Sequence, residues 1–446
     1  MYELTNLKMQ NRITAQLFAL LLLLAGFLSI EAQLPGMPTM ILKETKNVFG
    51  GTGADQANSI FRTTDGGFVV AGSTGSNNGD VSGNHGGQDM WVVKFNASGA
   101  IQWQKVLGGT GEDIAYSIIQ TTDGGYAVAG SSNSNDGDVS GNNGNQHMWV
   151  VKFNPTGTIQ WQQVYGGVAN TAYANSIIQT SDGGYAVAGR IYSSTNGTNV
   201  FVLKLGVTGN VEWQKEYGGS EIDYGYSIIQ TTDGGYAVAG FTKSNNGDVS
   251  GNHGGLDMWI IKLTATGTKQ WAKAFGGSGY DAANSIIQTS DGGYAVAGYT
   301  GSNDGNVSGN HGQNDMWVVK LSAAGNLEWQ KPLGNVYSDQ ANSIIQVTDG
   351  GYVVVGASSN ISNGNSDLFI VKLNSTGDIL WQKIYGGTGA DSASSVIQTT
   401  GDGYAVAANI ESNNGNVTGS FNGARDFFIP RLDSAGNFIR LYEDIP

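Results

Sequence analysis

Residues 117–130 have the sequence SIIQTTDGGYAVAG, and residues 148–167 continue the pattern as MWVVKFNPTGTIQWQQVYGG. The pattern recurs seven times, about every 58 residues, as expected for a repeat architecture. The aspartate of the first turn marks six copies, and Gly401 takes its place in the seventh: Asp65, Asp123, Asp182, Asp233, Asp291 and Asp349. Each copy is therefore expected to be one supersecondary unit that buries its faces against its neighbours.

Each copy contains four short apolar runs separated by turn residues. In the second copy these runs lie at 117–121, 126–130, 148–153 and 159–165. Residues 122–125 (TDGG) join the first two runs and residues 154–157 (NPTG) join the last two, and both are hairpin-turn sequences. Four antiparallel strands in each of seven units, without a helical pattern, predict an all-β fold, a seven-bladed β-propeller of four-stranded antiparallel blades.

Two features bear on how the blades pack and close. All ten tryptophans fall in the expected third and fourth strands, where we expect them to pack between blades rather than form a ligand platform. Pro430 falls in the third strand of the seventh copy, and its missing N–H predicts an irregular blade there. Either residues 41–49 or residues 438–442 could supply the strand that closes the ring. The first is favoured, because the linker that follows it, GGTGADQAN at 50–58, matches the other linkers.

The N-terminal segment differs from the repeats. Lys8 and Arg12 precede the apolar run LFALLLLLAGFLSI at 17–30, and the small residue Ala32 follows. This pattern predicts a secretory signal peptide at 1–32, because the run is shorter than the ~20 residues that a membrane span needs. The expected organisation is a signal peptide followed by a propeller at 33–446, with an N-terminal strand near 41–49 and repeats from about 50 to 446. The mature chain is expected to be an exported monomer without a membrane span, in the periplasm, on the cell surface or outside the cell.

Composition excludes several classes of function. The chain has no cysteine, so it has no disulfide framework and no thiol catalysis. It carries 36 acidic and 22 basic residues, with a formal net charge of −14. This balance disfavours nucleic acid and anionic membrane surfaces, because both require basic patches.

The repeat resembles the bacterial SBBP-type β-propeller repeat family, found in exported proteins of Bacteroidetes-like bacteria. The resemblance rests on the segment DMWVVKFNASG at 89–99, the linker LGGTGED at 107–113 and the block DGGYAVAG, and it covers about residues 41–446. It implies the propeller fold and export, and it specifies no activity. The Trp after the Thr-Gly turn also resembles quinoprotein propellers, but those enzymes usually have eight units and the chain has no paired cysteines.

In a propeller, the linkers between blades and the loops between second and third strands open on the same face. Both segments are rich in acidic residues here, and their only basic residues are Arg190, Lys243 and Arg425. This face is therefore predicted to carry a negative charge and to favour cations or a basic partner. The candidates for ligand contact on this face are aspartates of the linkers: Asp113, Asp223, Asp281, Asp339 and Asp391.

The long loops repeat an acid-x-acid-x-hydroxyl-Gly pattern. Alternating oxygen side chains before a glycine are how EF-hand-type loops wrap calcium. Counted from the first ligand, position twelve is aspartate in three copies. The candidate calcium ligands are Asn78, Asp80, Ser82, Asp89, Asp136, Asp138, Ser140, Asn246, Asp248, Ser250, Asp257, Asp304, Asn306, Ser308 and Asp315. The alternative is that these residues build turns, with the strand-start aspartate bonding the loop backbone.

No catalytic constellation emerges from the residues. The four histidines lie in these loops, where solvated side chains are expected, and no serine has a nucleophile-elbow setting. The leading hypothesis is a non-catalytic exported propeller that binds a protein or glycan partner through the acidic loop face, with calcium as a candidate stabilising ion. A carboxylate-based glycosidase or lyase on the same face, and a structural cell-surface role, are the alternatives.

Overall fold

The computed structural model describes residues 31–32, 40–44, 47–167, 170–193, 197–359, 365–417, 423–439 and 442–445. The chain divides into two compact units, Asn47–Phe438 and a smaller one drawn from Met1–Lys46 and Ile439–Pro446. The described residues form strands, turns and loops, and no helix among them is long and apolar enough to cross a membrane.

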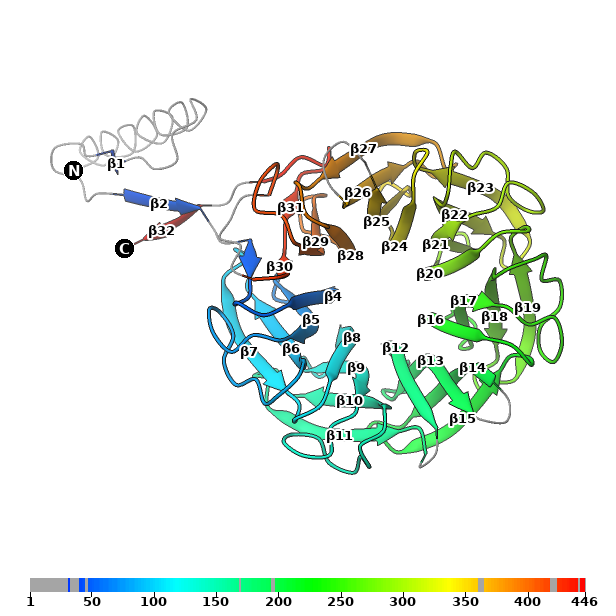
Figure 1. The fold of residues 1–446 in the computed structure, drawn as a ribbon, viewed down its shortest axis with the longest axis horizontal. Coiled ribbons are helices and arrows are strands. Elements are labelled where there is room, and N and C mark those ends of the chain that lie inside the picture. Colours follow the sequence, from blue (N-terminus) through cyan, green and yellow to red (C-terminus); the bar gives the residue numbers. More distant parts are fainter. Residues whose placement is uncertain are drawn as a thin grey trace, which may run out of the picture. The chain divides into compact units, whose positions relative to one another are not determined.

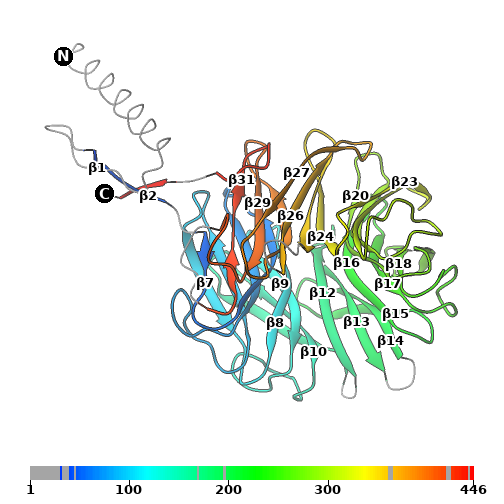
Figure 2. The same cartoon turned by 45° about the horizontal axis from the view of Figure 1, so that its top comes forward.

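The larger unit is a ring of seven antiparallel blades, as predicted (Figure 1). The first strand of each blade lies innermost and the fourth outermost (Figure 1). Blades one to three consist of β4 (Asp55–Arg62), β5 (Phe68–Thr74), β6 (Asp89–Phe95) and β7 (Ile101–Leu107); β8 (Asp113–Gln120), β9 (Tyr126–Ser132), β10 (His147–Phe153) and β11 (Ile159–Tyr165); and β12 (Thr171–Gln179), β13 (Tyr185–Ser193), β14 (Gly197–Leu205) and β15 (Val211–Tyr217). Figure 2 shows β12, β13 and β14 side by side in the third blade.

The remaining blades repeat this order. Blades four to six consist of β16 (Asp223–Gln230), β17 (Tyr236–Thr242), β18 (Asp257–Leu263) and β19 (Lys269–Phe275); β20 (Asp281–Gln288), β21 (Tyr294–Thr300), β22 (Asp315–Leu321) and β23 (Leu327–Leu333); and β24 (Asp339–Gln346), β25 (Tyr352–Ser359), β26 (Ser366–Leu373) and β27 (Ile379–Tyr385). Blade seven contains β28 (Ser392–Gln398), β29 (Tyr404–Ile410), β30 (Asp426–Phe428), β31 (Arg431–Leu432) and the N-terminal β3 (Val48–Phe49).

The first strands are longer than the apolar runs predicted. In blade two the strand begins at Asp113 rather than Ser117, and a bulge separates Ala115 from Ser117. The residues ahead of the bulge pair with the end of the second strand, although they lack a continuous apolar run. The aspartates assigned to linkers therefore stand at or next to the start of the innermost strands.

The tryptophans pack between blades, as expected. Trp91, Trp149, Trp259 and Trp317 of the third strands are at most 1% exposed. The fourth-strand tryptophans contact the next blade; Trp103, for example, meets the ring of Tyr126 edge-on at 5.3 Å. The core is therefore a set of blade-to-blade interfaces rather than one central cluster.

Both ends of the larger unit contribute to closure. β3 pairs with β30, so the N-terminal segment closes the ring as predicted, but only through Val48 and Phe49. Phe438 forms a single bridge to Leu432 in the other half of the same third strand. Pro430 separates the two halves; its carbonyl accepts Val406 N–H at 3.1 Å, and the ring nitrogen cannot return the bond.

The rest of the predicted N-terminal strand belongs to the smaller unit. There β2 (Met40–Glu44) pairs with β1 (Glu31–Ala32) and with β32 (Tyr442–Ile445). The predicted strand 41–49 is thus divided between two sheets. The predicted signal peptide, apart from β1, lies outside the described residues.

Candidate functional site

The linker face is the face of the ring that carries the inter-blade linkers, such as residues 276–280, and the loops between second and third strands, such as residues 301–314. All five linker aspartates proposed as ligand contacts are 0% exposed: Asp113, Asp223, Asp281, Asp339 and Asp391. They lie beneath this face rather than on it. Carboxylates buried at that depth do not contact the surface of a large partner.

Asp281 shows what these carboxylates do. The Thr300 hydroxyl donates to its Oδ1, while Ser302 Oγ donates to Oδ2 at 2.7 Å and Gly277 N–H donates to Oδ2 at 2.9 Å. One side chain thus joins the linker, the second strand and the loop that follows it. Asp223 has the same set of partners in blade four.

The long-loop residues also turn toward the linkers. At the first position of the pattern, Asp136 accepts Thr110 N–H at 2.8 Å and Asp304 accepts Ser278 N–H at 2.7 Å. These bonds from Thr110 and Ser278 lower the pKa values of both carboxyls. At the third position, Asp138 accepts Gly108 N–H at 3.3 Å.

The serine at the fifth position of the loop pattern bonds the fourth strand instead of a linker. Ser308 Oγ accepts a hydrogen bond from Gln330 of the fourth strand at 3.0 Å, and Ser140 accepts one from Gln162. Alternate residues of the loop therefore bond different segments, which matches the turn-building alternative. Calcium in these loops stays a prediction.

Position twelve of the loop pattern lies deeper. Asp89, Asp257 and Asp315 are 0% exposed and begin the third strands. Each accepts the backbone N–H of a loop histidine through Oδ2, and the ring Nδ1 of that histidine lies close to the same oxygen; for His253 and Asp257 these distances are 3.0 and 2.6 Å. These three histidines are thus hydrogen-bonded to buried carboxylates, while between 37% and 53% of each side chain remains exposed to solvent, as predicted for loop histidines.

A cluster of aromatic residues around Arg190 was not identified from the sequence. Arg190 Cζ lies 4.0 Å from the ring centre of Tyr173 and 4.5 Å from that of Tyr224, so two blades contribute the faces that stack on one guanidinium. Tyr224 and Tyr226 in turn pack on Phe241. The ring centre of Phe241 lies 4.7 Å from that of Tyr224 and 5.8 Å from that of Tyr226. We call these five residues the Tyr–Arg cluster.

Among the described residues, no carboxylate neutralises the charge of Arg190. Of the three basic residues that the sequence places on the linker face, Lys243 pairs with Glu221 at 3.3 Å and Arg425 pairs with Glu411 at 2.6 Å. Within the described part of the chain, no carboxylate or hydrogen-bond acceptor contacts Arg190. Burial raises the pKa of Tyr226 to about 12, so the neighbouring phenol stays neutral and does not supply the counter-charge.

Departures from the repeat could have revealed this cluster. Tyr173 and Tyr224 occupy a first-strand position that holds Gln56 and Gln340 in blades one and six. Arg190 stands where other blades have Ser, Phe, Tyr, Ala or Asn. A search for regularity selects the repeated aspartates and passes over such single departures.

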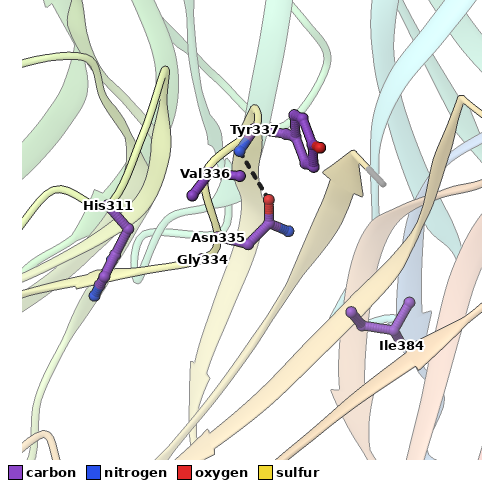
Figure 3. A pocket seen from close by; sticks show the side chains of 6 residues that line it. All are labelled: His311, Gly334, Asn335, Val336, Tyr337 and Ile384. Atoms are coloured by element: carbon purple, nitrogen blue, oxygen red, sulfur yellow. Dashed lines mark hydrogen bonds between the residues drawn. The ribbon is translucent and has the colours of Figure 1, made fainter. Parts of the chain in front are cut away.

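A hollow of about 560 Å³ lies between blades five and six (Figure 3). It is lined by His311, Gly334, Asn335, Val336, Tyr337 and Ile384. Tyr337 N–H donates to Asn335 Oδ1 at 2.8 Å, which shapes the linker at its rim (Figure 3). The lining offers one histidine and no carboxylate, so it lacks the acid pair that glycoside hydrolysis uses. No group of three or more acidic, histidine or cysteine side chains with metal-site spacing occurs among the described residues.

No family model matches the chain, and no curated protein matches it. Solved structures match the chain at low identity. Sqt1 from Chaetomium thermophilum is 12% identical with a TM-score of 0.44, covering 89% of this chain and 86% of that one. A protein of unknown function from Dyadobacter fermentans DSM 18053 is 13% identical with a TM-score of 0.44, covering 89% and 99%.

A puromycin hydrolase S511A mutant, solved as a complex with PGG, is 11% identical with a TM-score of 0.49. The match covers 88% of this chain and 55% of that one, so this chain spans about half of the hydrolase. Likenesses at this level carry no information about activity.

Proposed function

We propose that this chain is a non-catalytic binding propeller whose Tyr–Arg cluster holds a protein or glycan partner that carries an acidic group. The observation that carries the proposal is the guanidinium of Arg190, which is stacked between Tyr173 and Tyr224 and has no carboxylate partner in the part of the chain that the structure describes. Tyrosine and arginine dominate binding hot spots, because they combine a large apolar face with directed hydrogen bonds. An Arg fork held in this way suits a carboxylate or sulfate. This replaces the basic partner expected from the acid-rich sequence of the face, because the five linker aspartates are buried.

The cluster also breaks the seven-fold regularity of the ring, which a site for one partner requires. Further exposed apolar side chains lie on the same face at blades three to five, on the strand of Arg190 and in the linkers: Tyr192 (52% exposed), Ile222 (37%) and Tyr280 (62%). Apolar side chains around a polar anchor are typical of a recognition surface.

Export is part of the proposal. The SBBP-type repeat, the apolar run at 17–30 and the absence of cysteine support a secreted binding protein of bacterial origin. A glycosidase on the same face would need carboxylates that reach the sugar. The linker aspartates are instead buried and hydrogen-bonded to the chain, which favours binding over hydrolysis.

The test is direct binding of the full chain to a panel of immobilised acidic and neutral polysaccharides and acidic and neutral proteins. Arg190→Gln should weaken binding to acidic members at least tenfold, and added salt should weaken it further. Lys243→Gln is the matched control, because Lys243 lies on the same face but pairs with Glu221. Equal affinities of the two variants, or hydrolysis of a bound polysaccharide, would reject the proposal.

A further inference from the structure

Adjacent blades bring two buried aspartates together beneath the linker face. One begins the third strand of a blade, and the other stands at the start of the first strand of the next blade. The pairs are Asp89 with Asp113, Asp257 with Asp281, Asp315 with Asp339, Asp367 with Asp391, and Asp426 with Asp55. Nine of these ten residues are 0% exposed, and Asp367 is 5% exposed. The pairing joins residues that the sequence pattern assigns to separate loops and linkers.

The backbone fixes each pair. In the interface of blades four and five, Asp281 N–H donates to Leu256 O at 2.7 Å, so the residue preceding Asp257 is clamped to the next blade. Gly276 lies against both carboxylates: a methyl group on its Cα would lie 2.5 Å from Asp281 Oδ2 and 2.8 Å from Asp257 Oδ1. The two oxygens therefore face the same small space.

Four of the pairs contain a buried oxygen that has no hydrogen-bond partner among the described residues. These oxygens are Oδ1 of Asp89, Asp257, Asp315 and Asp367, and Oδ1 of Asp113 is a second one in the first pair. No hydrogen bond among the described residues joins the two carboxyls of a pair. Burial raises the pKa of Asp257, and the Asp281 carboxylate adds to this effect. Two like charges buried together, with an unused oxygen, are unfavourable unless a further group neutralises them.

At the other two interfaces the corresponding space is not lined by two carboxylates. Between blades two and three, His147 and Ala172 replace both aspartates, and the imidazole spans the space by bonding Gly167 O at 2.8 Å and Asn142 Oδ1 at 2.7 Å. Between blades three and four, Asn199 faces Asp223, which removes one charge. One of these interfaces thus loses both carboxylates, whereas the other keeps a single one.

We propose that each aspartate pair binds one calcium ion between neighbouring blades. Two carboxylates balance one divalent charge, whereas a monovalent cation would leave a net buried charge. Calcium accepts carboxylate and carbonyl oxygens in irregular geometry at about 2.3–2.6 Å, while magnesium demands near-octahedral geometry. The pairs contain no thiolate, and where a histidine is present its Nδ1 lies against the aspartate Oδ2. Zinc is therefore disfavoured, because it prefers thiolate and free imidazole ligands. These sites lie beneath the loops and are independent of the Tyr–Arg cluster.

Calorimetric titration of the metal-stripped full chain with CaCl₂, with MgCl₂ as control, tests this proposal. Calcium should bind at several sites per chain and raise the melting temperature. Asp257→Asn should abolish one site, and it should fold because Asn199 stands naturally at the equivalent position. Asp248→Asn and Asp304→Asn are matched controls in the loops above and should leave the stoichiometry unchanged.

Three results would overturn the proposal. Loss of a site in Asp248→Asn or Asp304→Asn, but not in Asp257→Asn, would place calcium in the loops. Binding of MgCl₂ equal to that of CaCl₂ would remove the ion specificity. Absence of calcium binding to the wild-type chain would show that the pairs are not calcium sites, whatever the pH dependence of stability.

Discussion

Lys262→Met should destabilise the propeller. Lys262 forms a salt bridge with the partly exposed Asp233, and salt bridges with exposed partners usually contribute little to stability, but its own amino group is buried. Lys262 Nζ donates to Asp233 Oδ2 at 2.8 Å, to Gln270 Oε1 at 3.0 Å and to Leu263 O at 3.1 Å. The lysine side chain is 5% exposed, whereas that of Asp233 is 53% exposed. Equivalent buried lysines occupy the third strands of blades one to six, so the result applies to six blades.

The magnitude follows from which acceptors lose their donor. Hydrogen bonds that involve a charged group contribute about 1.5–3 kcal/mol each, but water replaces most of what the exposed Asp233 loses. Methionine keeps the apolar stem, and water can also replace the donor at the exposed Gln270, so the remaining loss is mainly at the buried Leu263 O, about 1–3 kcal/mol. Partial burial raises the pKa of Asp233, but hydrogen bonds from Lys262 and Thr231 outweigh it and bring the pKa to about 2. In the variant this pKa should rise.

The measurement is urea-induced unfolding of the full chain followed by tryptophan fluorescence. Lys269→Met is the control in the same blade, because Lys269 pairs with Asp248 at 2.6 Å while 33% exposed. Its loss should cost about 0–1 kcal/mol. Equal costs for the two variants would refute the argument that burial of the amino group decides the energy.

Three further predictions concern the interfaces. Gly276→Ala should lower the free energy of unfolding in urea by about 2–4 kcal/mol, because the new methyl group meets two carboxylate oxygens. The control is Gly292→Ala, where φ is +83° and nothing lies within 4 Å; it should lower the free energy by only about 1–2 kcal/mol, and the reverse order would contradict this reasoning. Trp317→Phe should cost about 1–2 kcal/mol more than Trp259→Phe in chemical denaturation, since Trp317 Nε1 donates to Gln330 at 2.7 Å while Trp259 Nε1 is buried without a partner; equal costs would count against it. Burial and the neighbouring carboxylate raise the pKa of Asp257, so the folded metal-free chain binds protons more tightly than the unfolded chain, and its stability should rise as pH falls from 7 toward about 4. Below about 4 the turn aspartates reverse this trend, because the pKa of Asp233 is about 2 and its stabilising contribution is lost as pH falls through that value; urea midpoints in EDTA that decline steadily from pH 7 downward would be inconsistent with the raised pKa.

Local chemistry made most of the fold predictable. The turn residues 122–125 require a positive φ, and Gly124 has φ +80°. Pro430 lacks an N–H, and the third strand of blade seven is interrupted there. The start of the first strand at Asp113 was missed, because the residues ahead of the bulge pair without an apolar run. The division of the segment 41–49 between β3 and β2 depends on pairing with residues near the other end of the chain.

The candidate sites were less predictable. The pattern selected these aspartates because their spacing is regular, but it placed Asp281 and Asp257 in separate features on a surface. In the structure they share one buried space across a blade interface. The stacking of Tyr173 and Tyr224 on Arg190 likewise joins residues of two blades, and the amino acid types alone do not show which rings will meet.

The sequence alone determined the repeat, the strands, the turns and the number of blades. Each of these depends on residues within about 58 positions of one another, where turn chemistry and apolar alternation act locally. Only the tertiary structure decided burial and partnership: which carboxylates face each other, which cation lacks a counter-ion, and how the two termini divide the closing strand. Those properties depend on contacts between blades, and ring closure sets which residues from distant copies share the same space.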